Sequence, residues 1–305
     1  MKICVITSHK NLYAPKRILE EGKKRGHKMY LTTWEDIIVN LRNGKFYFGD
    51  KKKSFSEFDA IIPRSDRYSI NINGKRIRRD LNTIFRLLVE YARSNKIFFL
   101  NSRYFSEYQS IDKLTQQFFF LKNNLPGIST YYFSNEKKQR TGIKNLNFPI
   151  VAKIAQGSTG TSVFKCKNKK ELENFIKERN ADEKFFLFQD YYKINCDYRV
   201  LVVGQKVLGI MKRSANKGEW RTNFSLGGNV EKSESNKEME KIALNTAKKM
   251  GFDYLGIDLL ENRNKFYIIE TNSLPQFKGF EKAFNNINVA KEIIRLVESK
   301  IKNKK

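Results

Sequence analysis

The order of the predicted elements changes once along the chain, and this change constrains the fold more than any other feature. Residues 3–7 ("ICVIT") predict a buried strand, "YAPKRILEEGKKRG" a helix that ends at a glycine, and "HKMYLTTW" the next strand. A strand–helix–strand start indicates a parallel sheet covered by helices. After about residue 105 the predicted elements become strand-rich and antiparallel. We therefore expect an α/β protein with an N-terminal α/β domain followed by strand-rich lobes.

Length and cysteine usage narrow the class further. The 305 residues suffice for two or three lobes. The longest apolar runs are too short to cross a membrane, and "MKICVITS" predicts a first strand rather than a signal peptide. Cys4, Cys166 and Cys196 lie far apart, which indicates free thiols in a reducing compartment and argues against zinc. We expect a cytoplasmic protein with no membrane partner.

The formal net charge of +27 allows two interpretations. The basic residues are scattered, which is typical of a solvated surface with biased composition, but they also suit an acidic partner. A nucleic-acid-binding protein is an alternative. The sequence shows no RRM, KH or helix-turn-helix signature, so we expect no specific nucleic-acid partner.

Two acidic residues lie on consecutive predicted strands, "YLGIDLL" and "FYIIETN". If the chain turns through residues 263–265, Asp258 lies directly opposite Glu270. Asn272 points to the same side, because side chains alternate along a strand. Facing carboxylates repel unless a cation holds them, and oxygen ligands suit Mg²⁺ or Mn²⁺. A four-residue loop would place Ile257 opposite Glu270 instead, and a solvated acidic pair is the alternative to a metal site.

Lys153 interrupts the apolar strand "FPIVAKIA", where a lysine without a partner is unusual. A segment bounded by Gly157 and Gly160 follows, and its small residues would let backbone amides approach phosphate oxygens. Together these features indicate a phosphate site, although no Walker motif occurs. The alternative is an ordinary hairpin beside a lysine whose ammonium reaches solvent.

Two further segments carry polar residues suited to a nucleotide or an anion. The strand "FFLFQDYY" ends in polar residues, where backbone groups can pair with an adenine edge, and Asp197 follows and could take ribose hydroxyls. The segment 211–228 gathers Lys212, Arg213, Arg221 and Asn223 beside a Gly-Gly turn, a composition that can bind an anion. A basic surface loop is the alternative.

Taken in order, these segments resemble the ATP-grasp superfamily, and within it the RimK-like branch of carboxylate–amine ligases. The resemblance covers almost the whole chain. "SIDKL" resembles the Asp-Lys of the nucleotide lobe, "EWRTNFSLGGN" the Arg-Ser-Asn and Gly-Gly segment, and "GIDLL…YIIETNSLPQFKGFEKA" the metal-binding strand pair. The resemblance implies an ATP-grasp fold preceded by a pre-ATP-grasp domain, with domains at residues 1–106, 107–192 and 193–305.

The resemblance also implies roles for individual residues. The implied ligands of a pair of Mg²⁺ or Mn²⁺ ions are Asp258, Glu270 and Asn272. The residues implied to bind ATP are Lys113, Lys153, Gly157, Gly160, Asp190, Tyr191, Asp197, Arg221, Thr222 and Asn223. We expect Arg213 and Arg221 to act in catalysis, and Arg64 and Arg67 to bind substrate carboxylates. Asp190 stands where a Glu is usual, and Thr222 replaces a Ser. The segment after Arg64, which is expected to shape the substrate pocket, departs from the branch pattern.

The implied reaction forms an amide at the expense of ATP. ATP phosphorylates a carboxylate, an amine attacks the acylphosphate, and ADP and phosphate leave. The implied substrates are glutamate or another amino acid and an acceptor that is a protein tail, a peptide or a cofactor; the charge favours an acidic acceptor. The alternatives are a kinase of the same fold, a nucleic-acid-binding protein and a non-catalytic ATP-grasp module. Homo-oligomer formation is left open.

Overall fold

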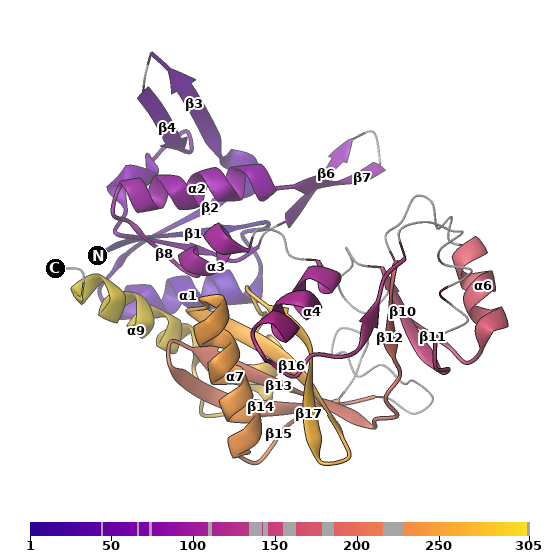
Figure 1. Ribbon diagram of the computed structural model, residues 1–305. Helices are drawn as coiled ribbons and strands as arrows, with labels where there is room; N and C mark the ends of the chain where they lie inside the picture. The colour runs from indigo at the N-terminus through magenta and orange to yellow at the C-terminus, as the bar shows by residue number, and fades with distance from the viewer. Residues whose placement is uncertain are drawn as a thin grey trace.

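The computed structural model describes most of the chain. It covers residues 1–43, 45–65, 67–72, 75–108, 112–133, 142, 146–154, 163–178, 186–215 and 229–303, and for residues 45, 67–72, 75–80 and 82 it describes the backbone alone. The described strands form three larger sheets and two separate hairpins (Figure 1). The predicted α/β class is confirmed, with a parallel sheet first and antiparallel sheets after it.

The first sheet is parallel, as the strand–helix–strand start predicts. Its order is β2-β1-β5-β8, and the apolar residues of the inner strands are buried on both faces. The predicted hairpin near Asn43 is present as β3–β4, whereas the β6–β7 hairpin was not expected. The elements of this N-terminal domain are β1 (Lys2–Thr7), α1 (Tyr13–Lys24), β2 (Lys28–Thr33), η1 (Trp34–Asp36), β3 (Ile38–Arg42), β4 (Lys45–Gly49), η2 (Phe55–Glu57), β5 (Ala60–Pro63), β6 (Arg67–Ile72), β7 (Lys75–Asp80), α2 (Asn82–Ser94), β8 (Phe98–Phe99) and α3 (Ser102–Glu107).

The second sheet, called the central sheet below, is antiparallel with the order β11-β10-β12-β9. Its apolar residues on one face pack against α6 and form a core of their own. The preceding helix α4 lies against the third sheet instead, where it contacts β17. The elements of this part are α4 (Lys113–Lys122), β9 (Thr130–Tyr131), β10 (Ile150–Ile154), β11 (Val163–Cys166), α6 (Lys169–Glu178) and β12 (Phe186–Asp190).

The third sheet, called the C-terminal sheet below, has the order β15-β14-β13-β16-β17. Helix α7 covers one face, and residues of α8 and α9 pack against the other. The strand boundaries follow the two predicted hairpins closely. The elements are β13 (Cys196–Val203), β14 (Lys206–Ser214), β15 (Asn229–Lys232), α7 (Lys237–Met250), β16 (Tyr254–Asn262), β17 (Lys265–Asn272), α8 (Lys278–Ala283) and α9 (Val289–Lys302).

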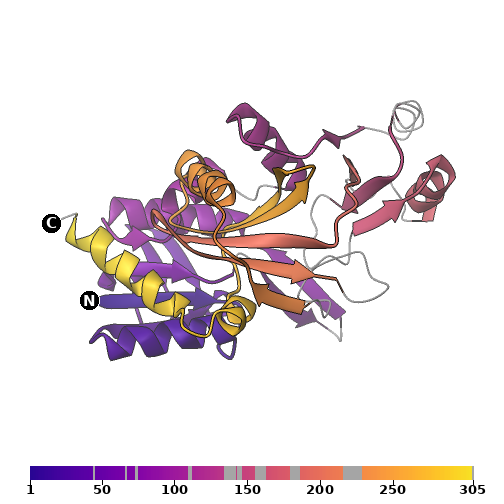
Figure 2. The same ribbon diagram turned by 90° about the horizontal axis from the view of Figure 1, so that it is seen from below.

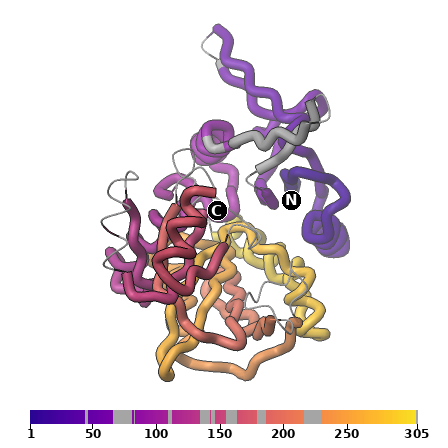
Figure 3. The backbone as a smooth tube through the Cα atoms, turned by 90° about the vertical axis from the view of Figure 1, so that its right-hand side faces the viewer, coloured from indigo at the N-terminus to yellow at the C-terminus, as the bar shows by residue number. Residues whose placement is uncertain are grey.

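The N-terminal domain and the C-terminal sheet share two hydrophobic cores, whereas the central sheet has a separate one. Stacking of Tyr104 on Phe252, with ring centroids 4.0 Å apart, is one contact between the first two. Figures 1 and 2 show the consequence: the central sheet and α6 lie at one end of the molecule, and α9 with both termini lies at the other. Figure 3 shows the β3–β4 hairpin projecting away from the C-terminal sheet.

The three cysteines are free thiols, as predicted, and Cys4 and Cys166 are buried. No helix among the described residues is long and apolar enough to cross a membrane.

Candidate active site

The β16–β17 hairpin turns more tightly than the sequence analysis expected. Asn262 pairs with Lys265, so the connection holds two residues, Arg263 and Asn264, and both have positive φ. Turns of this kind match the natural twist of a two-stranded ribbon. An uninterrupted ladder from this turn would place the apolar Ile257 opposite the glutamate of the site.

A β-bulge restores the predicted pairing at the acidic residues. The register shifts next to Asp258, so that Ile269 has no partner in the ladder and Asp258 pairs with Glu270. The amide of Asn272 lies on the same side, because its Nδ2 donates to Oε1 of Glu270 at 3.3 Å. The predicted facing carboxylates are confirmed, although the three-residue turn that led to them is wrong.

Asp258 is held by two arginines from neighbouring strands. Arg199 on β13 pairs with Asp258 in the ladder and donates Nε to Oδ1 and Nη2 to Oδ2, both at 2.7 Å. Arg213 on β14 places its Nη2 2.9 Å from Oδ2 of Asp258. Arg213 also donates Nε and Nη2 to the two oxygens of Asp197, at 2.6 and 2.7 Å. Side chains from three adjacent strands therefore form one row of paired charges, called the charge row below.

Asp258 and Arg213 are the buried centre of the charge row, and their partners favour the ionised form of each. Asp258 is 2% exposed and Arg213 is 3% exposed. Burial alone would raise the pKa of Asp258, but Arg199 and Arg213 hold it below its usual range. Burial would likewise lower the pKa of Arg213, whereas Asp258 and Asp197 raise it above its ordinary value. Removal of one member would leave a buried charge uncompensated.

The atoms of Asp258, Glu270 and Asn272 fit a hard cation in kind. A carboxylate offers about four acceptor positions, and the two arginines use three of those on Asp258. One position on Oδ1 therefore stays open beside the half-buried Glu270. Among the described residues no group of three His, Cys, Asp or Glu could hold a metal. A cation at this pair would complete its coordination with phosphate oxygens and water, as Mg²⁺ commonly does.

Helix α4 fixes the acidic strand through two adjacent glutamines. Gln116 accepts from the backbone N–H of Thr271 at 2.8 Å and donates to its carbonyl at 3.3 Å. Gln117 donates Nε2 to the carbonyl of the bulge residue Ile269 at 3.0 Å. Lys113, a predicted ATP ligand, is the first residue of this helix. The element that locks β17 in place therefore also positions this cation.

The central sheet presents Lys153 toward the acidic residues. Ile150 and Ala152 of β10 belong to the core beneath α6, so alternation places Lys153 on the opposite face. Its ammonium is buried but forms no ion pair with any residue that the structure describes. The pKa of Lys153 is lowered to about 8, mainly by burial and in part by nearby Lys113, while Glu270 and Asp258 partly offset the effect. Both lysines and both carboxylates thus converge between the two sheets.

Gln189, near the end of β12, lies on the same face of the central sheet as Lys153, because it pairs with Val151. Gln189 is 2% exposed and donates Nε2 to Oγ1 of Thr130 at 2.8 Å, while its Oε1 has no partner in the described part of the chain. The predicted ligand Asp190 ends the strand, and the ammonium of Lys165 lies 3.8 Å from the centroid of the Tyr191 ring. A buried acceptor without a donor is costly unless a ligand or water supplies one.

Arg64, predicted to bind a substrate carboxylate, is buried between the N-terminal domain and the C-terminal sheet. It is 1% exposed, donates Nη2 to the carbonyl of Pro275 at 2.7 Å, and lies over the rings of Tyr254 and Phe277. Its Nε and Nη1 have no hydrogen-bond partner among the described residues, and burial lowers its pKa. Arg64 is therefore a buried cation without a described carboxylate.

Several predicted residues cannot be placed. Arg67 begins β6, where the structure describes only the backbone. Gly157, Gly160, Arg221, Thr222 and Asn223 lie outside the described residues.

Sequence reasoning missed Arg199, Gln189 and the glutamine pair of α4. Arg199 could have been found, because it stands two residues after Asp197 and strand alternation places both on one face. Gln189 could also have been found, because it is a polar residue inside an apolar strand, which is the feature that singled out Lys153. Nothing in the sequence pattern of α4 indicates that Gln116 and Gln117 contact β17, more than a hundred residues away.

Two family models match the chain. The RimK-like ATP-grasp domain matches residues 110–297, and the RimK PreATP-grasp domain matches residues 1–92. A probable alpha-L-glutamate ligase of Vibrio atlanticus (strain LGP32) is 29% identical over 99% of this chain and 97% of its own length. A probable alpha-L-glutamate ligase of Shewanella loihica (strain ATCC BAA-1088 / PV-4) is 28% identical over the same shares.

Solved structures show the same fold at lower identity. A RiPP-associated ATP-grasp ligase of Chryseobacterium gregarium, in complex with ADP and a leader and core peptide, has a TM-score of 0.72 at 17% identity, covering 98% of this chain and 97% of that one. The macrocyclase MdnC of Microcystis aeruginosa MRC, bound with the precursor peptide MdnA, has a TM-score of 0.70 at 16% identity, covering 98% and 100%. The ligase PsnB, complexed with minimal precursor, Mg and ADP, has a TM-score of 0.68 at 16% identity, covering 98% of each chain.

The first family model alone spans more than half of the chain, and it ends beyond the strand pair that carries Asp258 and Glu270. The chain therefore belongs to the RimK-like ATP-grasp family of ATP-dependent ligases.

Proposed function

We propose that this ligase joins glutamate, or another amino acid, to the carboxylate of a peptide or protein acceptor, with ATP and Mg²⁺ or Mn²⁺ as cofactors. One observation carries the proposal: Asp258 and Glu270 face each other on adjacent strands, and Lys153 approaches them from the central sheet. The names of the relatives support glutamate as the amino acid, and the peptide complexes of the structural neighbours support an acceptor that is a peptide.

The triphosphate of ATP would lie between the central and C-terminal sheets. Lys153 and Lys113 are the cations for its phosphate oxygens, and Asp258, Glu270 and Asn272 would hold the metal ions on the opposite side. The metal supplies charge neutralisation between the phosphates during transfer. Gly157, Gly160, Arg221, Thr222 and Asn223 stay proposed phosphate contacts on the family resemblance.

The adenosine would lie along the end of β12. Asp190 and Tyr191 stay proposed ligands there, and we add Gln189. Its unpartnered Oε1 lies on the face that Lys153 shares and suits the 6-amino group of adenine. Asp197 stays a proposed contact of the ribose, and both of its oxygens also accept from Arg213. We therefore propose that Asp197 positions Arg213.

Arg213 remains the proposed group that meets the charge of the acylphosphate. Its ion pairs with Asp197 and Asp258 fix the guanidinium beside the metal-binding carboxylate, so no reorganisation is needed when charge develops. Arg64 and Arg67 stay proposed carboxylate contacts. In favour of Arg64, its Nε and Nη1 are buried and lack described partners, and an incoming carboxylate would supply the missing charge.

The net charge of +27 supports an acidic acceptor over a neutral one. We place the protein in the cytoplasm because its thiols are free. The proposed reaction needs no specific nucleic acid.

A screen of amino acids and acidic peptides with ATP and Mg²⁺ tests the proposal, with ADP release and product mass as readouts. Glu270→Gln should lower amide formation by about a thousandfold or more, since a hard-cation site loses one anionic ligand, while the melting temperature stays within a few degrees. Glu261→Gln, an exposed carboxylate on the paired strand, is the matched control and should keep full activity.

Amine-independent phosphate transfer would identify a kinase instead. Wild-type activity of Glu270→Gln with Mg²⁺ as the only metal would remove the metal assignment.

A further inference from the structure

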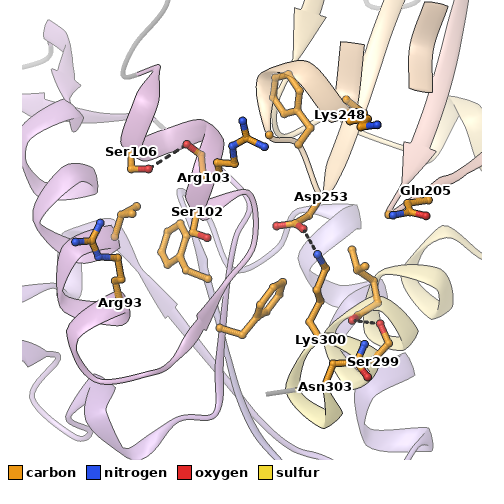
Figure 4. A pocket seen from close by; sticks show the side chains of 18 of the residues that line it. Arg93, Ser102, Arg103, Ser106, Gln205, Lys248, Asp253, Ser299, Lys300 and Asn303 are labelled. Atoms are coloured by element: carbon orange, nitrogen blue, oxygen red, sulfur yellow. Dashed lines mark hydrogen bonds and ion pairs between the residues drawn. The ribbon is translucent and has the colours of Figure 1, made fainter. Parts of the chain in front are cut away.

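A cavity lies at the junction of the N-terminal domain and the C-terminal sheet (Figure 4). Figure 1 shows that the helices around it lie away from the central sheet. Its volume is about 1160 Å³. The ends of α2, α3, α7 and α9 and the β13–β14 turn line it. We refer to this cavity as the junction groove.

The junction groove has an apolar floor. Val89, Phe98, Phe99 and Phe252 line it and are each less than a tenth exposed, because they belong to the two cores that join the domains. The floor is therefore rigid, and the cavity does not depend on a loose segment. Apolar side chains of a ligand could bury surface against it.

The rim of the groove is basic. The described residues that line it include four bases, Arg93, Arg103, Lys248 and Lys300, and one acid, Asp253. Asp253 is already engaged, since it pairs with Lys300 at 3.2 Å and accepts a hydrogen bond from the backbone of Asn101. Arg93 and Arg103 form ion pairs with glutamates that do not line the groove.

Arg93 pairs with Glu90 and Arg103 with Glu107, at 3.8 and 3.0 Å. These side chains are largely exposed, and exposed pairs of this kind contribute little, so an incoming carboxylate can replace them. Lys248 is exposed and forms no ion pair with any described residue. The rim thus offers cations that are available to an acidic ligand.

The placement of these cations favours an extended ligand. Figure 4 shows Arg93 and Lys248 on opposite sides of the groove with Arg103 between them, on three different helices. A phosphate or another small anion needs donors that converge on one point. The volume also exceeds the range of about 300–1,000 Å³ typical of small-molecule sites. Serine, asparagine and glutamine side chains around the rim, including Ser106, can serve a peptide backbone.

We propose that the junction groove binds an acidic peptide segment of the acceptor, and so holds the acceptor on the enzyme while its reactive carboxylate lies at the charge row. The inference rests on the proposed function for the identity of the peptide. It adds a second point of attachment, formed by residues that take no part in binding ATP.

The fold sets a minimum distance between the two sites. Strand β13 runs from Asp197 at the charge row to the turn at Gly204, which lines the groove. At about 3.3 Å per residue this separation is roughly 23 Å. An extended acceptor therefore needs at least about seven residues between its anchoring segment and its reactive end.

Binding can be tested without ATP. A fluorescein-labelled decapeptide of glutamates with leucine at every third position is titrated with the full-length protein at physiological salt, with anisotropy as the readout. The double variant Arg93→Glu/Lys248→Glu should weaken binding by about tenfold or more, since two rim cations become like charges. The control Lys170→Glu/Lys177→Glu changes the net charge equally on exposed residues of α6, at the other end of the molecule, and should bind as the wild type does.

Equal weakening in both double variants would reduce the binding to the overall charge of the protein and overturn the proposal. Displacement of the peptide by ADP or phosphate at similar concentrations would mark the groove as a small-anion site, with the same consequence. So would a dimer in sedimentation that only the groove variant disrupts. Loss of peptide binding in the groove variant alone supports the proposal even if no amide-forming activity is found, so its failure and that of the proposed function can be told apart.

Discussion

The two sheets that face each other at the candidate active site handle buried charge in opposite ways. The C-terminal sheet buries Arg213 and Asp258 as members of a fully paired row. The central sheet buries Lys153 without an ion pair to any described residue, and the pKa of this lysine is lowered to about 8. A paired row is complete before any ligand arrives, whereas a lone buried cation gains its counter-charge from an anionic ligand.

This difference suggests a division of roles. The C-terminal sheet provides a preformed, rigid surface, and each partner in its row holds the next in place. The central sheet carries an unfavourable charge in the free enzyme, and binding of phosphate relieves that penalty. Part of the affinity for the nucleotide would then come from relieving the desolvation penalty of Lys153 in the central sheet, in addition to the contacts that the nucleotide makes with the two sheets. Four experiments test the comparison.

The largest effect is expected on breaking the charge row. Arg213→Met should lower the free energy of unfolding by about 3–5 kcal/mol, because Asp197 loses its bidentate partner and Asp258 one of two. Urea unfolding measures the change. Lys212→Met is the control, because Lys212 is the neighbour on β14 and its pair with Glu231 is exposed; it should change stability by less than about 1 kcal/mol. Equal losses in the two variants would contradict a cooperative row.

For the central sheet, we expect removal of the buried charge to stabilise the protein rather than to destabilise it. Lys153→Met should raise the free energy of unfolding at pH 7 by up to about 3 kcal/mol, because burial lowers the lysine pKa from 10.5 to about 8 in the folded state. The same variant should bind ADP and ATP more weakly, as calorimetry would show. Lys167→Met, at an exposed position after β11, should change neither quantity. A destabilised Lys153→Met protein would show that the lysine has a structural partner.

The pH dependence of this stability difference follows from the proton binding of the folded and unfolded states. The unfolded chain binds a proton at Lys153 up to about pH 10.4, whereas the folded protein releases it near pH 8. Wild-type stability should therefore rise between these values, and the advantage of Lys153→Met, full below pH 8, should disappear above about pH 10.4. Denaturation series at several pH values for both proteins would reveal it.

The smallest effect is expected in the pH dependence of nucleotide affinity. Phosphate oxygens favour the charged lysine, so binding of ADP near pH 8 should take up a proton, and affinity should fall by up to about tenfold per pH unit above that value. Calorimetry in two buffers with different heats of ionisation counts the protons. A Lys153→Met protein that still takes up a proton at pH 8 would assign the effect to another group.

Local patterns predicted much of the site, and long-range pairing explains what they could not. Alternation along β16 and β17 was enough to oppose Asp258 and Glu270, and a lysine inside an apolar strand was enough to single out Lys153. Arg199 meets Asp258 only because β13 pairs with β16, strands separated by β14, β15 and α7 in the chain. The position of Arg64 depends on Pro275, which is 211 residues away and belongs to another domain. No periodicity within one segment carries such information.

The bulge in β17 sets the register in which the site residues of the β16–β17 hairpin pair. Counted from the two-residue turn, the pairing register would place Ile257 opposite Glu270. One unpaired residue, Ile269, shifts the register so that Asp258 lies opposite Glu270 instead. What matters at Ile269 is its presence rather than its side chain. Deletion of this one residue would leave every acid, amide and base of the site in the sequence and yet set them out of phase, so the geometry of the metal ligands is encoded partly in the length of the strand.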